Sequence, residues 1–275
     1  MFEEIFALMQ SVGVTVFKLL PWFVALGVAF TLLSVFWACN PGRPWWRKRE
    51  LVTDLCYWFI IPLFARYLRI GMLVLGAAFL FNINTPDGLV EFYDDGHGPL
   101  AQLPLLVQAA IFLLGSDVMM YWIHRAFHRN ALWKYHAVHH SSEELDWISA
   151  ARFHPVNLFL GSIATDVVLL LAGISPNVLV FLGPFTIAHS AFVHANLRWT
   201  LGPLRYLIAG PVFHRWHHTA AGRGGEKNFA STFPFLDVLF GTFYMPKNAL
   251  PDAYGIADPQ FPAGFGAQMI YPFKH

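Results

Sequence analysis

Charged residues are scarce in this chain. Only 13% of its 275 residues are Asp, Glu, Lys or Arg, whereas roughly a quarter are charged in soluble domains. Hydrophobic residues make up 56%, and the mean hydropathy is +0.47. This composition excludes an ordinary soluble domain and predicts an integral membrane protein embedded in the bilayer.

Three further absences narrow the class. The formal net charge is only +1, so no electrostatic attraction to nucleic acid is expected and none is predicted as a partner. The only two cysteines, Cys39 and Cys56, lie in apolar sequence and predict buried thiols, not a disulfide framework. Glu3 and Glu4 stand near the start with no basic segment before the first apolar run, so no cleavable signal peptide is expected.

Long apolar stretches predict about four transmembrane helices and hence an all-α membrane fold. The second stretch is interrupted by Arg66 and Arg69, and it fits either one tilted span or a shallow segment followed by a short span. The fourth contains Gly173, Ser175 and Pro176 in its middle and predicts a hairpin of two short spans. The four stretches are 12–38, 51–81, 103–123 and 156–193.

The distribution of basic residues predicts the orientation. Four Lys or Arg residues lie in 40–50, whereas 82–102 has four acidic residues and no Lys or Arg. Positively charged loops stay on the cytoplasmic side, so 40–50 is expected there and 82–102 on the opposite side. The domain prediction is a single membrane domain, 1–275, in three parts. These are N-terminal spans (1–123), a histidine-motif catalytic region (124–244) that includes the membrane hairpin at 156–193, and a cytoplasmic tail (245–275).

Histidine is abundant among the residues that can bind a metal ion, with thirteen in the chain. Eleven of the thirteen histidines lie between His124 and His218, many of them three or four apart and therefore on one face of a helix. Burying several imidazoles together is unfavourable unless something pairs with them, and neutral imidazole is a good ligand for iron, zinc or copper. The clusters on one membrane face offer more nitrogens than one ion uses, so they predict two metal ions.

Three histidine motifs carry a resemblance to a known family. They are His124-Arg-Ala-Phe-His128, His136-Ala-Val-His-His140 and His214-Arg-Trp-His-His218. With Arg152-Phe-His-Pro155, His194-Ala-Asn196 and the blocks 117–122, 228–229 and 237–242, they resemble the fatty acid hydroxylase and sterol desaturase superfamily of membrane di-iron enzymes. The resemblance covers 113–244. It implies a four-span helical fold with a cytoplasmic, helical metal-binding cap, O2 as oxidant and electrons from a reductase chain.

The resemblance implies the ligand set. Nine histidines match the family's ligand positions individually, and His189 is a tenth candidate that matches less closely. Asp117, His154 and Asn196 are candidate hydrogen-bond partners of ligands; for His154, a metal ligand and a helix cap are the alternatives. The predicted metal ligands are His124, His128, His136, His139, His140, His189, His194, His214, His217 and His218.

The predicted function is O2-dependent hydroxylation or desaturation of a lipid, such as a sterol or fatty acyl chain, at a di-iron centre. No Gly-x-Gly-x-x-Gly motif or iron–sulfur cysteine set is present, so the electrons are expected from a separate reductase or carrier. Zinc is expected to replace iron on overexpression. The predicted location is the bacterial inner membrane, or the endoplasmic reticulum in a eukaryote, with the metal site cytoplasmic. A membrane zinc hydrolase and a non-catalytic metal-binding protein are the alternatives.

Overall fold

The computed structural model describes residues 2–94, 96–220 and 222–274. Within these ranges all regular structure is helical and no strand occurs, as the all-α prediction requires. Four of the described helices are long and apolar enough to cross a bilayer, so the chain is an integral membrane protein. They are α1 (Phe2–Trp37, apolar over Phe17–Trp37), α2 (Leu51–Phe81), α5 (Leu105–Phe127) and α9 (Asn177–His194).

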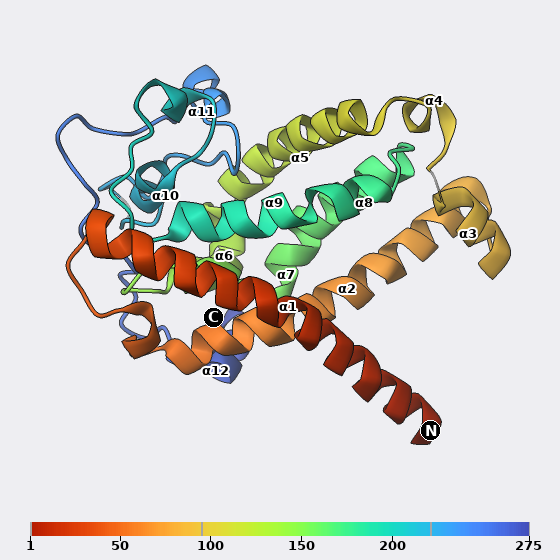
Figure 1. Ribbon diagram of the computed structural model, residues 1–275, viewed down its shortest axis with the longest axis horizontal. Helices are drawn as coiled ribbons and strands as arrows, with labels where there is room; N and C mark the ends of the chain where they lie inside the picture. Colours follow the sequence, from red (N-terminus) through yellow and green to blue (C-terminus); the bar gives the residue numbers. More distant parts are fainter. Residues whose placement is uncertain (1, 95, 221, 275) are drawn as a thin grey trace.

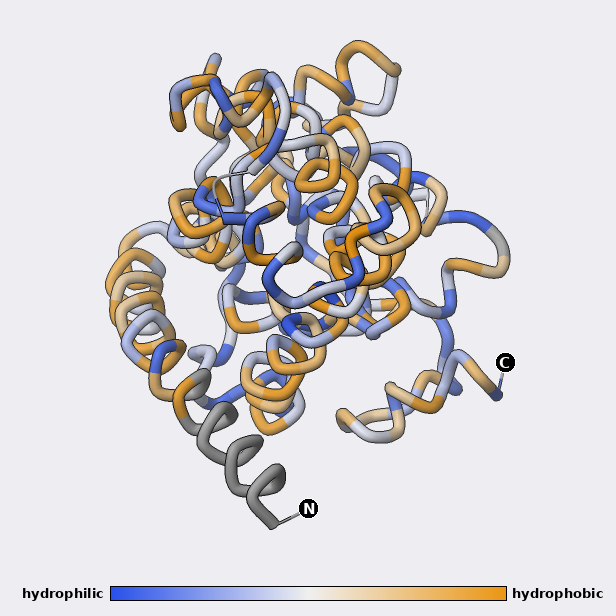
Figure 2. The backbone as a smooth tube through the Cα atoms, turned by 90° about the vertical axis from the view of Figure 1, so that its right-hand side faces the viewer, coloured by the Kyte–Doolittle hydropathy of each residue, from blue (hydrophilic) through white to orange (hydrophobic). Residues whose placement is uncertain are grey.

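Shorter helices connect and cover these spans. Figure 2 shows hydrophobic colouring along most of the helical tube, with hydrophilic stretches mainly in the connections. The shorter α-helices are α3 (Pro86–Tyr93), α4 (Gly98–Ala101), α6 (Asn130–His140), α7 (Pro155–Leu158), α8 (Ala164–Leu171), α10 (Pro211–His217), α11 (Phe235–Leu239) and α12 (Phe265–Ile270). Single 3-10 turns lie at Trp45–Arg47, Trp147–Ala151, Gly202–Tyr206 and Tyr271–Phe273.

The stretch 51–81 forms one continuous helix, α2. Its 31 residues correspond to about 46 Å of helix, which exceeds the roughly 30 Å hydrocarbon core of a bilayer. Arg69 forms an ion pair with Asp166 of α8, with 2.8 Å between Nη2 and Oδ2, so its charge is paired within the fold. The sequence allowed either one tilted span or a shallow segment followed by a short span. The structure has one long helix with a paired arginine.

The stretch 156–193 reverses direction between α8 and α9. Gly173 in this turn has φ +105°, and a Cβ there would lie 2.1 Å from the carbonyl oxygen of His97, so only glycine fits. The two arms are unequal, because the first arm, Pro155–Leu171, is shorter than a span. That arm contains a π-helical turn at Phe159–Ile163, where Gly161 departs from helical geometry (φ −97°, ψ −110°).

The ends of the spans gather the histidine motifs. Figure 1 shows the C-terminal ends of α5 and α9 on the same side of the molecule as α6 and α10, with α3 and α4 at the opposite end. Trp147 is fully buried beneath this end and contacts the rings of Phe23, Trp45 and Trp58 at centroid distances of 5.1, 5.0 and 5.6 Å. This aromatic cluster joins α1 and α2 to the chain that follows the second histidine motif.

The arrangement predicts the relative sidedness of three exposed residues. With Cys39 and Cys56 replaced by alanine, we expect Arg49→Cys and Arg223→Cys to react from one side of the membrane, and Asp94→Cys only from the other. Arg49 and Arg223 lie beside the histidine-bearing ends, and Asp94 follows α3 at the opposite end. An impermeant maleimide applied to intact cells and to inverted vesicles measures this. Labelling of all three from one side would contradict the four-span arrangement.

Candidate metal centre

Four helix ends bring the nine histidines together. His124 lies in the last turn of α5, with His128 at its C-cap, and His194 ends α9. The second motif lies on α6 and the third on α10, whose C-cap is His218. Eight of the nine side chains are buried, and His128 is partly buried. Histidines far apart in the sequence therefore share one interior region.

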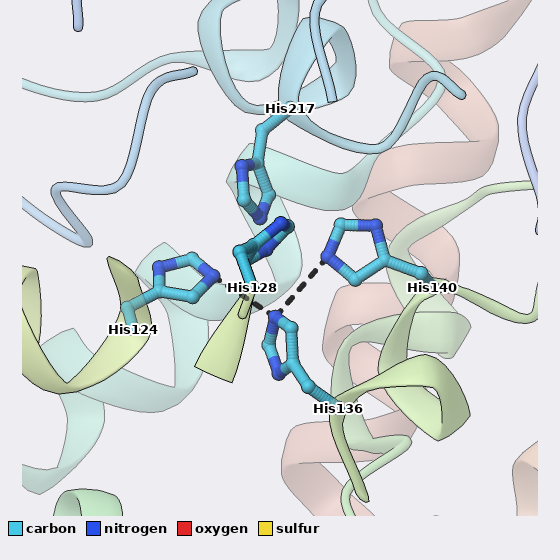
Figure 3. Close-up of side chains that lie close together, drawn as sticks. All are labelled: His124, His128, His136, His140 and His217. Atoms are coloured by element: carbon cyan, nitrogen blue, oxygen red, sulfur yellow. Dashed lines mark hydrogen bonds between the residues drawn. The ribbon is translucent and has the colours of Figure 1, made fainter. Parts of the chain in front are cut away.

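The nine histidines form two groups. Within each group, one ligand atom from every histidine lies within 4.8 Å of the others. The first group, shown in Figure 3, is His124, His128, His136, His140 and His217. The second is His139, His194, His214 and His218. The groups adjoin, because the rings of His140 and His218 stack with centroids 4.5 Å apart.

Each His-x-x-His-His motif contributes to both groups. The motif on α6 gives two histidines to the first group and one to the second, and the motif on α10 does the reverse. On α6, His136 and His140 belong to the first group and His139 to the second. On α10 the i and i+4 histidines join the second group, and His217, at i+3, joins the first. Residues i and i+4 lie about 40° apart around a helix, whereas i+3 lies on the other flank. The motif spacing therefore places two adjacent sites side by side.

Hydrogen bonds fix which ring nitrogen carries the proton. Nδ1 of His124 lies 2.8 Å from the carbonyl oxygen of Phe229, and Nδ1 of His136 lies 2.7 Å from Oδ1 of Asn157. These oxygens only accept, so both Nδ1 atoms are protonated and both Nε2 atoms of the neutral rings carry a lone pair. His139 and His194 are held in the same way, by the carbonyl oxygens of Arg152 and Ser190.

The unprotonated Nε2 atoms face one another. They are 3.0 Å apart between His124 and His136, and 3.3 Å apart between His139 and His194. Two lone pairs at this distance repel unless an electrophile lies between them. Nitrogens bound to one ion at about 2.1 Å lie about 3.0–3.4 Å apart in octahedral or tetrahedral geometry. The spacing therefore fits metal coordination, and no hydrogen bond between neutral rings of this tautomer explains it.

Two buried nitrogens support the same fit. Nε2 of His128 and Nε2 of His217 are buried without a hydrogen-bond partner. Nδ1 of His217 lies 2.7 Å from the carbonyl oxygen of Lys227, so its Nε2 also presents a lone pair. An unpaired buried polar atom costs about 1–3 kcal/mol. Two such atoms in one group are accounted for by a metal ion that completes their coordination.

Burial keeps these imidazoles neutral. Desolvation holds the pKa of His136 well below its usual value, and the neighbouring His124 lowers it further. The pKa values of His140 and His217 are lowered in the same way, first by burial and then by other rings of the cluster. Burial therefore favours the neutral ring, which is the form that binds a metal ion.

Two predicted histidines lie outside both groups. His189 was the tenth candidate ligand; its Nε2 lies 3.1 Å from the carbonyl oxygen of Ala209, and its ring stacks on Phe185. His154 caps α7, because its Nδ1 accepts the backbone N–H of Val156 at 3.1 Å. Its Nε2 lies 3.2 Å from the carbonyl oxygen of Met269. Of the three roles considered for His154, the helix cap is the one this geometry matches.

Asp117 and Asn196 support the site from a distance. Asp117 was a candidate hydrogen-bond partner of a ligand; its carboxylate instead accepts the backbone N–H groups of Ser231, Thr232 and Phe233 at 2.6–2.9 Å. It thereby holds the segment that follows Phe229, the residue whose carbonyl orients His124. Asn196 exchanges two hydrogen bonds with the backbone of Asn40 and fixes the chain after α1.

The partners that orient the ligands were largely missed by sequence reasoning. Asn157, which holds His136, lies in apolar sequence without a motif. The carbonyl groups of Phe229, Lys227 and Arg152 hold three further ligands, and a backbone carbonyl has no sequence signature. Arg152 and Phe229 stood in recognised motifs, but neither motif indicated that the backbone carbonyl contacts a histidine.

A cavity of about 290 Å³ adjoins both groups. His124 and His136 of the first group line it, together with three histidines of the second group. From there it extends between α5, the α7–α8 arm and α9, where its surface is mostly apolar, with side chains such as Phe112, Met120 and Phe185 beside several Ser and Thr residues. The two histidine groups therefore lie beside a cavity with a mostly apolar surface.

Comparisons with known proteins find relatives over the part of the chain that contains the histidine motifs. The fatty acid hydroxylase family model matches residues 109–242. The ornithine lipid hydroxylase of Rhizobium tropici is 31% identical over 174 residues, covering 63% of this chain and 52% of that protein. The alkylglycerol monooxygenase of Danio rerio is 34% identical over 147 residues, 53% of this chain and 32% of that protein.

A putative methylsterol monooxygenase of Dictyostelium discoideum is 32% identical over 164 residues, which covers 52% of this chain and 54% of that protein. The chain thus spans about half the length, or less, of these three relatives. No solved structure matches the chain significantly.

The unequal groups predict unequal sensitivity to the loss of a ligand. We expect about two metal ions per chain in the wild-type protein, since there are two groups. His214→Ala leaves three nitrogens in the second group and should reduce the content to about one ion. His217→Ala leaves four in the first group and should weaken binding without emptying that site. Elemental analysis of purified protein and competition with a chelator measure both.

His97→Ala is the matched control. His97 lies before α4, stacked on Phe92 with ring centroids 4.1 Å apart, and its replacement should leave the metal content unchanged. Removing the metal should also lower the melting temperature, because the facing lone pairs then repel and binding energy is lost. Folded wild-type protein without any bound metal would contradict the site.

Proposed function

The chain belongs to the fatty acid hydroxylase and sterol desaturase superfamily through residues 109–242, and from this premise we propose that it hydroxylates or desaturates a lipid with O2. The observation that carries the proposal is the pair of histidine groups, with facing unprotonated Nε2 atoms, at one end of an apolar cavity within the spans. The relatives named for lipid hydroxylation and monooxygenation support it.

The nine histidines would hold two iron ions, which supply the O2 and electron-transfer chemistry that side chains lack. The protein's own contribution is to fix the ligands. Each Nδ1–H of His124, His139 and His217 is donated to a backbone carbonyl, which fixes the tautomer and the ring orientation. Neither group contains a carboxylate or a thiolate, so the ligand field is made of neutral nitrogen donors.

The cavity between α5 and α9 would hold the lipid. Its walls include Phe112, Leu158 and Val193, which exclude water. Thr186 lines the cavity and is exposed on the span α9, so a lipid can enter sideways from the bilayer. One carbon of the chain then lies beside the five histidines of the two groups that line the metal end.

Electrons would reach the metal centre from the side that faces away from the lipid cavity. A second cavity, of about 610 Å³, reaches His128 and His140 of the first group from the segments around Glu226 and Asp258. None of the residues that line this second cavity lines the apolar cavity, so a separate reductase or carrier can approach without crossing the lipid's path. By the distribution of basic residues this side is cytoplasmic, in a bacterial inner membrane or the endoplasmic reticulum.

The ligand chemistry disfavours the two alternative functions. A zinc hydrolase needs one ion, an open position and commonly a carboxylate base, whereas the described residues form two adjacent all-histidine groups. A metal carrier would place ligands along the spans, whereas these groups lie at the ends of α5 and α9. Two fixed sites beside an apolar cavity suit oxidation of a lipid.

Oxygen dependence tests the reaction. In membranes that contain the protein and a reductant, turnover of the lipid substrate should stop under strict anaerobiosis. Under ¹⁸O2, a hydroxylated product should contain ¹⁸O, and a desaturated product should form with O2 consumption but without the label. His214→Ala should abolish either product, because it removes a ligand of the four-histidine group. Comparative lipidomics of wild-type and deletion strains identifies the substrate for this assay.

Undiminished turnover without O2, with product oxygen derived from H2¹⁸O, would overturn the proposal in favour of the hydrolase. His97→Ala, which leaves the histidine groups intact, is the control for expression and membrane insertion.

A further inference from the structure

The apolar cavity contains polar residues far from its metal end. Asn157, which holds His136, marks the metal end on α7. Thr165 and Asp166 line the same cavity on α8, eight and nine residues further along the arm. Polar groups inside an apolar membrane segment are costly and commonly functional, so this pair requires an explanation.

Thr165 has an unsatisfied hydroxyl. The residue is 1% exposed, and its Oγ1 is buried without a hydrogen-bond partner. A helical threonine usually donates to the carbonyl four residues earlier, which here is that of Gly161. Gly161 lies in the π-helical turn with non-helical φ and ψ, and Thr165 makes no such bond. Thr186, in the same cavity, does: its Oγ1 donates to the carbonyl groups of Leu182 and Gly183.

Asp166 has one carboxylate oxygen paired. Both Nε and Nη2 of Arg69 contact its Oδ2, at 3.0 and 2.8 Å. The side chain of Asp166 is 14% exposed and lines the cavity, so Oδ1 remains as a hydrogen-bond acceptor there. The ion pair is neutral overall: a bound ammonium would be repelled by Arg69, and a bound carboxylate or phosphate by Asp166.

We propose that Thr165 and Asp166 form a binding site for an uncharged polar group, of the hydroxyl class, on the lipid that occupies the cavity. The hydroxyl would donate to Oδ1 of Asp166 and accept from Oγ1 of Thr165, which satisfies all three groups. The inference rests on the proposed function and deepens it. By anchoring one group eight to nine residues further along the arm than Asn157, the site determines which carbon lies beside the histidine groups.

Binding of two matched probes tests the site. Radiolabelled hexadecan-1-ol and hexadecane have the same chain, and only the alcohol carries a hydroxyl. Saturable binding to the full-length protein in nanodiscs is measured for the wild type, Thr165→Val and Thr186→Val, without a reductant. Valine has nearly the shape of threonine without the hydroxyl. A lost hydrogen bond of about 1 kcal/mol corresponds to about a fivefold loss of affinity, expected for hexadecan-1-ol in Thr165→Val only.

Hexadecane should bind all three proteins equally, and differences in partitioning between the probes cancel because each probe is compared across proteins. Thermal unfolding without a probe gives a second readout. Thr165→Val should be as stable as the wild type or more so, since it removes an unsatisfied buried hydroxyl. Hexadecan-1-ol binding equally to Thr165→Val and the wild type would overturn the site, as would a marked loss of stability, which indicates a structural role.

Charged probes test the argument from the ion pair. Hexadecylammonium and palmitate should show no loss of affinity in Thr165→Val, because neither is expected to use the site. A fivefold loss for either would overturn the preference for an uncharged group. Because no turnover occurs without a reductant, these results stand apart from oxygen dependence. If the probe-binding assays fail to show the site, the oxygenase proposal stands. If the oxygen-dependence assay shows anaerobic turnover, the binding site stands.

Discussion

The structure depends on bringing nine imidazole rings out of water with their Nε2 lone pairs facing one another. Neither desolvation nor lone-pair repulsion is favourable, and the facing distances of 3.0 and 3.3 Å are stable only around a cation. The fold therefore has its lowest free energy with the metal bound. The energy of coordination then also holds α5, α6, α9 and α10 together, since every group draws ligands from at least three of these helices.

The residues around the ligands decide that the rings point inward. Asp237 accepts the backbone N–H groups of Phe229 and Ala230, and Asp117 accepts those of 231–233. Two carboxylates thus stiffen one loop, so the carbonyl of Phe229 stays aimed at His124. Arg152 does the same on the other side: its buried guanidinium bonds to Asp54 and Glu50 near the start of α2, and its carbonyl holds His139. The spans are therefore coupled to ligand orientation through buried charges.

The sequence was sufficient for features that repeat along it. Apolar runs predicted the helical spans, and histidines three and four apart predicted shared helix faces, because both follow from local periodicity. It was insufficient where distant segments meet. That His139 and His140 belong to different groups depends on how α6 faces α9 and α10, and the role of Asn157 depends on how α7 packs against α6. His189 shows why the sequence is insufficient. It precedes His194 by five residues and was therefore a candidate ligand, yet its Nε2 contacts the carbonyl of Ala209. The packing of α9 determines that contact.

The same short arm connects the metal to the substrate. Asn157 and Thr165 lie on either side of the π-helical turn at Gly161, so the residue that orients His136 and the residue that we assign to the lipid hydroxyl belong to one arm, Pro155–Leu171. A regular helix would let Thr165 bond to the carbonyl of Gly161, and its hydroxyl would then be satisfied within the helix. The bend leaves it unsatisfied in the cavity. One irregular turn, which costs some helix stability, therefore sets both the space available to the lipid and the distance between its polar group and the site of oxidation.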